Sequence, residues 1–153
     1  MERMDGTARH PAASAPGALA LAAWAAYVLL AAFFYAGDYR PSVLTLGLCG
    51  VLTCLAVGLN FAYWRLVVVL ASIVYLLFYA FRVLSMVALT SGFEISALPS
   101  TLAFYFGSSW RVTLGLIQER GVAGGLAHGY FEYAMPILCV ALIVLAWMTW
   151  RRR

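Results

Sequence analysis

The chain has 153 residues, of which 65% are hydrophobic and 10% are charged, and its formal net charge is +4. Soluble domains carry about a quarter charged residues, so this composition excludes a water-soluble domain, which would need more polar surface. The length suits one membrane domain without a separate soluble catalytic module. The arginines form no basic face of the kind that binds nucleic acid.

Four long apolar stretches predict an all-α protein with four transmembrane helices. About 20 mainly apolar residues are needed to cross a hydrocarbon core of ~30 Å. We expect the spans to cover residues 17–37, 43–63, 66–90 and 130–150, after an N-terminal tail of residues 1–16. The first stretch exceeds the ~7–15-residue apolar core of a signal peptide. We therefore expect it to be a true span.

The distribution of arginine predicts the orientation, because cytoplasmic loops carry an excess of basic residues. With both termini in the cytoplasm, six arginines lie inside: Arg3, Arg9, Arg65, Arg151, Arg152 and Arg153. Three then lie outside: Arg40, Arg111 and Arg120. Short turns join the first three spans, so we expect an antiparallel bundle that ends in a basic cytoplasmic C-terminus at residues 151–153. The use of arginine as the only basic residue besides histidine indicates the codon usage of a GC-rich bacterium, and we expect the protein to lie in a bacterial inner membrane.

The segment 91–129 is the one sizeable element between spans, and it faces outward in this orientation. Pro99 begins one helical piece, Ser108 or Ser109 provides an N-cap for a second, and Gly121 is suited to end it. The apolar face of the second piece holds Trp110, Leu114 and Ile117. We expect an amphipathic segment that lies in the outer interface or caps the bundle. A flexible return into the last span holds Gly124, Gly125 and Gly129.

Small residues repeat every four positions in the first two spans. The first span carries Ala18, Ala22 and Ala26, and the second carries Gly50, Cys54 and Gly58. This spacing lets helix backbones approach closely, which favours association where lipid supplies no hydrophobic driving force. We therefore expect both sets to pack against other helices of this chain or of a partner.

The third span carries a polar stripe that includes a cation. Ser72, Tyr75, Tyr79 and Arg82 follow one another at spacings of three, four and three residues, which places them on one side of a helix. A guanidinium at membrane depth costs roughly 2.5–3.5 kcal/mol on insertion scales. We therefore expect the stripe to face the bundle, a partner subunit or a cavity.

Glu132 is the expected partner of Arg82. It lies near the outer start of the fourth span, and Arg82 lies about two turns below the outer end of the third, or ~12 Å at 1.5 Å per residue. A long arginine side chain reaches toward the same interface. The pair is suited to three roles: a structural contact, a ligand anchor or part of a proton path. Pro136 frees a backbone carbonyl near Glu132 and favours a bend there.

The remaining reactive residues indicate no catalytic, metal or cofactor chemistry. Cys49, Cys54 and Cys139 all lie in apolar stretches without a C-x-x-C pair, which favours packing over redox work. His10 and His128 are too far apart in the sequence to indicate a haem or copper site. We expect no catalytic residues, metal or cofactor, and no enzyme activity.

Two functions fit these observations. The first is a noncatalytic integral membrane subunit, or an assembly or stabilising factor, of a larger membrane complex. The small size, the packing faces and the structured outer segment favour it. The alternative is a small homo-oligomeric transporter or channel that uses the Arg82/Glu132 region. In either case the expected partners are the lipid bilayer and other membrane protein subunits or further copies of the chain.

Overall fold

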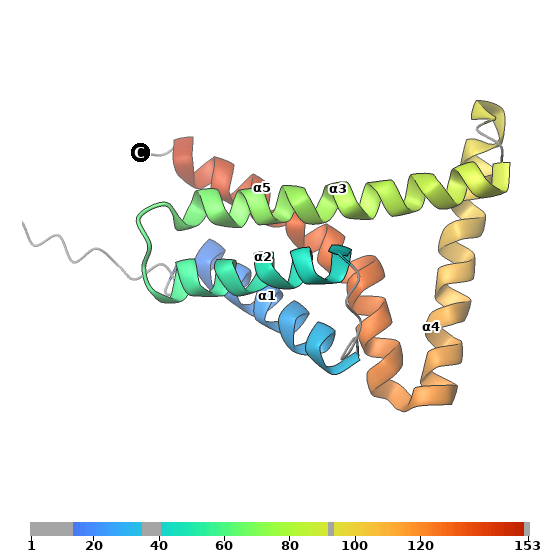
Figure 1. The fold of residues 1–153 in the computed structure, drawn as a ribbon. Coiled ribbons are helices and arrows are strands. Elements are labelled where there is room, and N and C mark those ends of the chain that lie inside the picture. The colour runs from blue at the N-terminus through green and yellow to red at the C-terminus, as the bar shows by residue number, and fades with distance from the viewer. Residues whose placement is uncertain (1–13, 35–40, 92–93, 152–153) are drawn as a thin grey trace, which may run out of the picture.

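A computed structural model describes residues 14–34, 41–91 and 94–151, and all secondary structure in these residues is helical (Figure 1). The helices are α1 (Ala15–Phe34), α2 (Pro41–Gly58), α3 (Trp64–Ser91), η2 (Ile95–Ala97), α4 (Leu98–Gly129), the π-helical turn η3 (Tyr130–Ala134) and α5 (Met135–Arg151). Four helical segments are long and apolar enough to cross a membrane. The structure thus supports the all-helical, multi-pass membrane protein that the sequence predicts.

The helix ends follow local sequence signals. The Ser14 hydroxyl accepts a hydrogen bond from the Gly17 N–H (3.3 Å) at the start of α1, and Pro41 begins α2, where its missing N–H is tolerated. The helix α2 ends at Gly58, five residues before the predicted end of its span. Asn60 then adopts a left-handed conformation with φ of 54°, which asparagine tolerates better than most residues. Residues 35–37, predicted to end the first span, lie outside the described residues.

The chain reverses direction between α1 and α2 and again between α2 and α3 (Figure 1). The helix α3 packs against both α2 and α5, and α1 packs against α2 and α5. With 28 residues, α3 is longer than these neighbours and extends beyond the end of α2. The helix α4 then crosses the direction of α3, and the chain returns through η3 into α5 (Figure 1).

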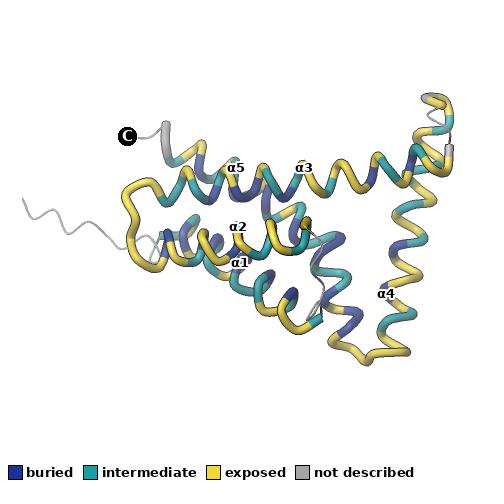
Figure 2. The backbone as a smooth tube through the Cα atoms, in the orientation of Figure 1, coloured by how far each residue is buried: buried dark blue, intermediate teal, exposed yellow. Residues whose placement is uncertain are grey.

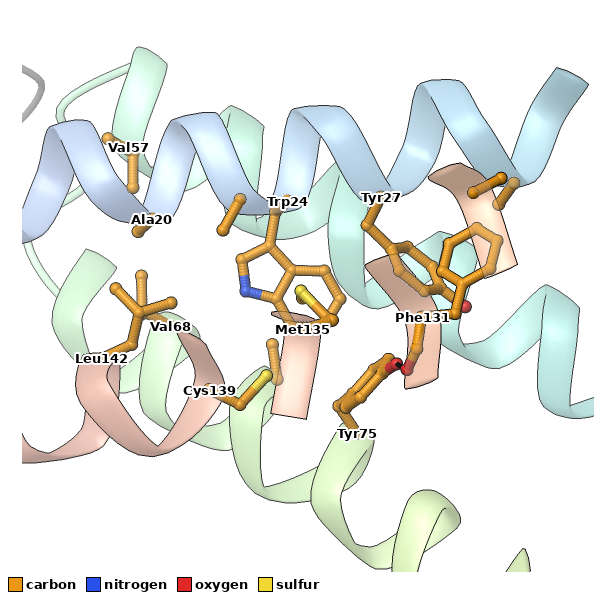
Figure 3. Packing of buried hydrophobic residues seen from close by; sticks show 14 residues of the cluster. Ala20, Trp24, Tyr27, Val57, Val68, Tyr75, Phe131, Met135, Cys139 and Leu142 are labelled. Carbon is orange, nitrogen blue, oxygen red and sulfur yellow. Dashed lines mark hydrogen bonds between the residues drawn. The ribbon is translucent and has the colours of Figure 1, made fainter. Parts of the chain in front are cut away.

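The core is built around aromatic rings from three elements (Figure 3). Trp24 and Tyr27 of α1 make edge-to-face contacts with Tyr75 of α3, at centroid distances of 6.2 and 5.6 Å. Tyr27 also contacts Phe131 of η3 at 5.2 Å. Such contacts contribute about 0.5–1.5 kcal/mol each beyond the area they bury. They join the first, third and last spans.

The aromatic core explains why the small-residue face predicted for α1 does not pack against another helix of this chain. Ala18 and Ala22 are exposed and Ala26 is half-buried, whereas Ala20, Ala23, Trp24 and Tyr27 are buried. Large rings bury more surface than a row of methyl groups, so they determine which side of the helix faces inward.

On α2, one of the three predicted packing residues makes a close helix–helix contact. A Cβ atom at Gly50 would lie 2.5 Å from Cγ2 of Val28 and 3.2 Å from Cε3 of Trp24, so the absence of a side chain lets α1 approach. Cys54 is half-buried against the core. Gly58 is exposed, and a Cβ atom there would meet nothing within 4 Å. Its predicted packing is therefore wrong within this chain.

Segment 91–129 differs most from its prediction. Helix α4 runs from Leu98 to Gly129 with a break at Gly121, and Ser108 and Ser109 lie within its first arm and not at a helix start. Gly121 breaks the helical geometry with φ of 76° and ψ of 177°, and the two arms fold against each other there (Figure 1). Gly124 and Gly125 are buried, and a Cβ atom at Gly125 would overlap the side chain of Ile117. These glycines permit close packing and do not form the flexible return that we expected.

Candidate functional site

Arg82 of α3 and Glu132 of η3 form the ion pair that the sequence predicts. Nη2 of Arg82 donates to Oε1 of Glu132 and also to the hydroxyl of Tyr105 (3.1 Å). The Tyr105 hydroxyl in turn donates to Oε2 of Glu132 (3.1 Å). Both carboxylate oxygens therefore have a donor. The Glu132 side chain is 6% exposed and that of Arg82 is 50% exposed, so the anion is the buried member of the pair.

Tyr105 is the residue of this site that sequence reasoning missed. It lies in the first arm of α4, 27 residues before Glu132, and its ring makes an edge-to-face contact with Phe106. Tyr105 is the one tyrosine in segment 91–129. This is the feature of the sequence that could have singled it out as a residue of the site. Spacing along the chain does not reveal the contact, because the fold of α4 at Gly121 determines it.

The other tyrosines of the polar stripe bind backbone, not side chains. The Tyr75 hydroxyl donates to the carbonyl of Phe131 (2.7 Å), and the Tyr79 hydroxyl donates to the carbonyl of Glu132 (3.0 Å). Ser72 is fully buried, and its hydroxyl makes no hydrogen bond to the other four residues. The structure therefore brings together four of the five predicted residues, Tyr75, Tyr79, Arg82 and Glu132, around η3.

The backbone of η3 explains why these two carbonyls accept from tyrosines. Pro136 has no N–H to donate to the carbonyl of Glu132, four residues earlier. The N–H of Met135 donates to the carbonyl of Tyr130, five residues earlier, and so does not pair with Phe131. A carbonyl left without a donor in hydrocarbon costs several kcal/mol. The two hydroxyls of α3 remove that cost.

Two further tyrosines tie η3 to the rest of the fold. The Tyr130 hydroxyl donates to the carbonyl of Ala23 in α1 (2.6 Å). The Tyr133 hydroxyl donates to the carbonyl of Phe106 in α4 (3.1 Å), and its ring contacts Trp110. The turn η3 is thus hydrogen bonded to α1, α3 and α4 at once.

A small cavity lies next to Tyr105. A cavity of about 40 Å³ lies between α3 and α4 and is lined by Tyr105, with Met86, Thr90 and Ser108 among its other residues. That volume holds about three water molecules, and neither Arg82 nor Glu132 lines it. Within the described residues, no group of three or more histidine, cysteine, aspartate or glutamate side chains is placed to hold a metal ion.

Comparisons with protein-family models, curated proteins and solved structures gave no match to this chain. The class that the fold defines is an all-helical, multi-pass membrane protein.

Removing one member of the ion pair is expected to destabilise the protein more than removing both. Arg82→Leu leaves the buried carboxylate without its cation, at a cost of about 2–4 kcal/mol. This lies below the value for a fully buried pair, because half of the Arg82 side chain is exposed to screening. Glu132→Leu should cost less, since Arg82 can turn to the surface. Unfolding of both variants and the double variant in detergent measures the coupling, with Arg111→Leu as the control for loss of a cation. Losses that simply add would contradict the prediction.

The hydrogen bond from the Tyr79 hydroxyl should stabilise the protein only while residue 136 is a proline, because proline has no backbone N–H to donate to the carbonyl of Glu132. Tyr79→Phe is expected to cost about 1 kcal/mol in the natural chain. In the Pro136→Ala background, residue 136 again has an N–H for the carbonyl of Glu132, so the cost should fall. Tyr63→Phe, at an exposed position, serves as the matched control. Equal losses in both backgrounds, measured by thermal unfolding, would show that the hydroxyl and the proline act independently.

Proposed function

We propose that this chain is a noncatalytic integral membrane subunit, or an assembly or stabilising factor, of a larger membrane complex. In this proposal α1, α2, α3 and η3–α5 form an antiparallel transmembrane bundle with both termini in the cytoplasm of a bacterial cell, and α4 lies on the extracytoplasmic side. The partners are lipid and other membrane protein subunits.

The main observation in favour of this proposal is the exposed apolar surface of α4. This helix buries Ser109 and Thr113, whereas Phe104, Trp110 and Val112 are 64%, 55% and 51% exposed. Figure 2 shows exposed positions along most of its length. A helix at a water-facing surface normally has the opposite distribution. These exposed apolar side chains therefore need a covering partner. They include the face of Trp110, Leu114 and Ile117, which we expected to lie in the outer interface or to cap the bundle.

The position of α4 favours a protein as that covering partner. A helix of 28 residues is about 42 Å long, which exceeds a hydrocarbon core of ~30 Å. If Trp64 marks the inner boundary, Arg82 lies 18 residues further along, at about 27 Å, and hence near the outer boundary. The helix α4 follows the overhanging end of α3 (Figure 1). Its apolar residues then lie largely beyond the hydrocarbon, where a neighbouring subunit can bury them.

The hydrogen bonding at Glu132 supports a structural role for the ion pair. Both carboxylate oxygens and the backbone carbonyl of Glu132 accept donors from this chain. A transporter, the alternative function, would have to open this arrangement in each cycle. The half-exposed guanidinium of Arg82 is the feature that favours the alternative.

The proposed orientation predicts where reporter enzymes are active. A reporter fused after Arg153 should show cytoplasmic activity, because most arginines outside the spans then lie on the inner side. A reporter inserted between residues 108 and 125 should show extracytoplasmic activity. The reverse pattern would place α4 in the cytoplasm and would overturn the assignment of the outer side.

The proposed complex predicts copurification that depends on the surface of α4. Extraction in a mild detergent followed by mass analysis should recover other membrane subunits in fixed stoichiometry. Val112→Gln introduces a polar group into the apolar surface and should reduce recovery by about tenfold, as for loss of a contact worth ~1.4 kcal/mol. Arg111→Gln, at the neighbouring exposed position, should leave recovery unchanged. A pure homo-oligomer that is insensitive to Val112→Gln would favour the transporter.

A further inference from the structure

A second polar position lies where the two arms of α4 meet the end of α1. A half-open cavity of about 60 Å³ lies there, and Phe34 of α1, Leu116 of α4 and Phe131 of η3 form its apolar wall. Arg120 and His128, from opposite sides of the break at Gly121, also line it. No acidic side chain is among the lining residues, and Arg120 supplies a permanent positive charge.

The break at Gly121 creates this cavity. A continuous α-helix would carry Arg120 and His128 eight residues apart along one rod, about 12 Å. The backbone of Gly121 instead turns the second arm back against the first. Gly124 also lines the cavity, and a Cβ atom there would lie 2.9 Å from Cβ of Arg120. A side chain at residue 124 would therefore displace Arg120.

The guanidinium of Arg120 is a cation that can bind a ligand. Its residue is exposed, and the salt bridge found among the described residues joins Arg82 to Glu132, leaving Arg120 without a carboxylate. A guanidinium presents several N–H donors in a planar fork, which suits the oxygens of a phosphate. The fork is therefore free to bind an anion at the mouth of the cavity.

The hydrogen bonds of His128 determine which ring nitrogen can meet a ligand. Nδ1 lies 2.8 Å from the Thr113 hydroxyl, and that hydroxyl donates its one proton to the carbonyl of Ser109 (3.0 Å). With that bond in place, the Thr113 oxygen accepts from Nδ1–H of His128, and Nε2 is the nitrogen left for a ligand. In the neutral ring Nε2 accepts a hydrogen bond, so it suits a hydroxyl or ammonium group beside an anion.

We propose that this cavity binds a phosphate group, held by Arg120 and presented by a phospholipid headgroup or by a free phosphate. The volume corresponds to about four water molecules, which matches the four oxygens of a tetrahedral phosphate. The wall of Phe34, Leu116 and Phe131 suits the glycerol and first carbons of a lipid, and Nε2 of His128 suits the hydroxyl or ammonium of its headgroup. The site does not depend on the proposed assembly with other subunits, and only the lipid source requires that α4 lie near a membrane surface.

Thermal unfolding of the purified full chain in dodecyl maltoside tests the site. Dihexanoyl phosphatidylglycerol is expected to raise Tm in a saturable manner. Arg120→Gln should raise the half-saturating concentration by about tenfold or more, as for a charged hydrogen bond. Because Arg120 is exposed, the variant is expected to fold. Arg111→Gln is the matched control, since Arg111 is exposed on the same helix and does not line the cavity.

The source of the phosphate follows from parallel titrations with inorganic phosphate and with dihexanoylglycerol at constant ionic strength. Saturation by inorganic phosphate, lost in Arg120→Gln, identifies a free phosphate as sufficient. Saturation by the phospholipid alone identifies a lipid headgroup. The proposal is overturned if neither phosphate compound raises Tm saturably, if dihexanoylglycerol acts as well as the phospholipid, or if Arg120→Gln responds as the natural chain does. None of these results depends on whether partner subunits copurify.

Discussion

The need to satisfy backbone carbonyls in an apolar environment dominates this structure. Pro136 and the π-helical hydrogen bond from Met135 to Tyr130 divert the donors that would serve the carbonyls of Phe131 and Glu132. Two tyrosine hydroxyls from α3 take their place. Because an unpaired carbonyl is costly in lipid, the register between α3 and the last span is tightly constrained. A slide of one turn would leave both carbonyls without their donors.

The ion pair depends on this register. Tyr79 and Arg82 are three residues apart on α3, so the hydrogen bond that places Tyr79 at the Glu132 backbone also places Arg82 beside the Glu132 side chain. Tyr105 then ties the same carboxylate to α4. The resulting network joins three segments through one residue. Its coupling is the physical reason why single changes in it should not be additive.

Glycine has two different roles in the chain. Gly121 adopts a positive φ that reverses the direction of α4. Gly50 and Gly125 are instead required by proximity, to Trp24 and Val28 in one case and to Ile117 in the other. The second role cannot be read from a list of glycines, because it depends on which side chain lies opposite. For this reason the sequence predicted a flexible glycine-rich return, whereas the structure shows that Gly124 and Gly125 are closely packed.

The apolar stretches determined the helical class, the four long segments and their approximate limits, since helices satisfy backbone groups in lipid internally. The polar stripe and its spacing also indicated the contact between Arg82 and Glu132, because the charges are few and a buried one needs a partner. Tertiary structure alone decided the burial of Ser109 and Thr113, the place of Tyr105, and the exposure of Ala18, Ala22 and Gly58. On a membrane helix without a polar stripe, such as α1, polarity does not specify which side faces inward. Ring packing, close approach at glycines and the demand for hydrogen-bond donors decide it.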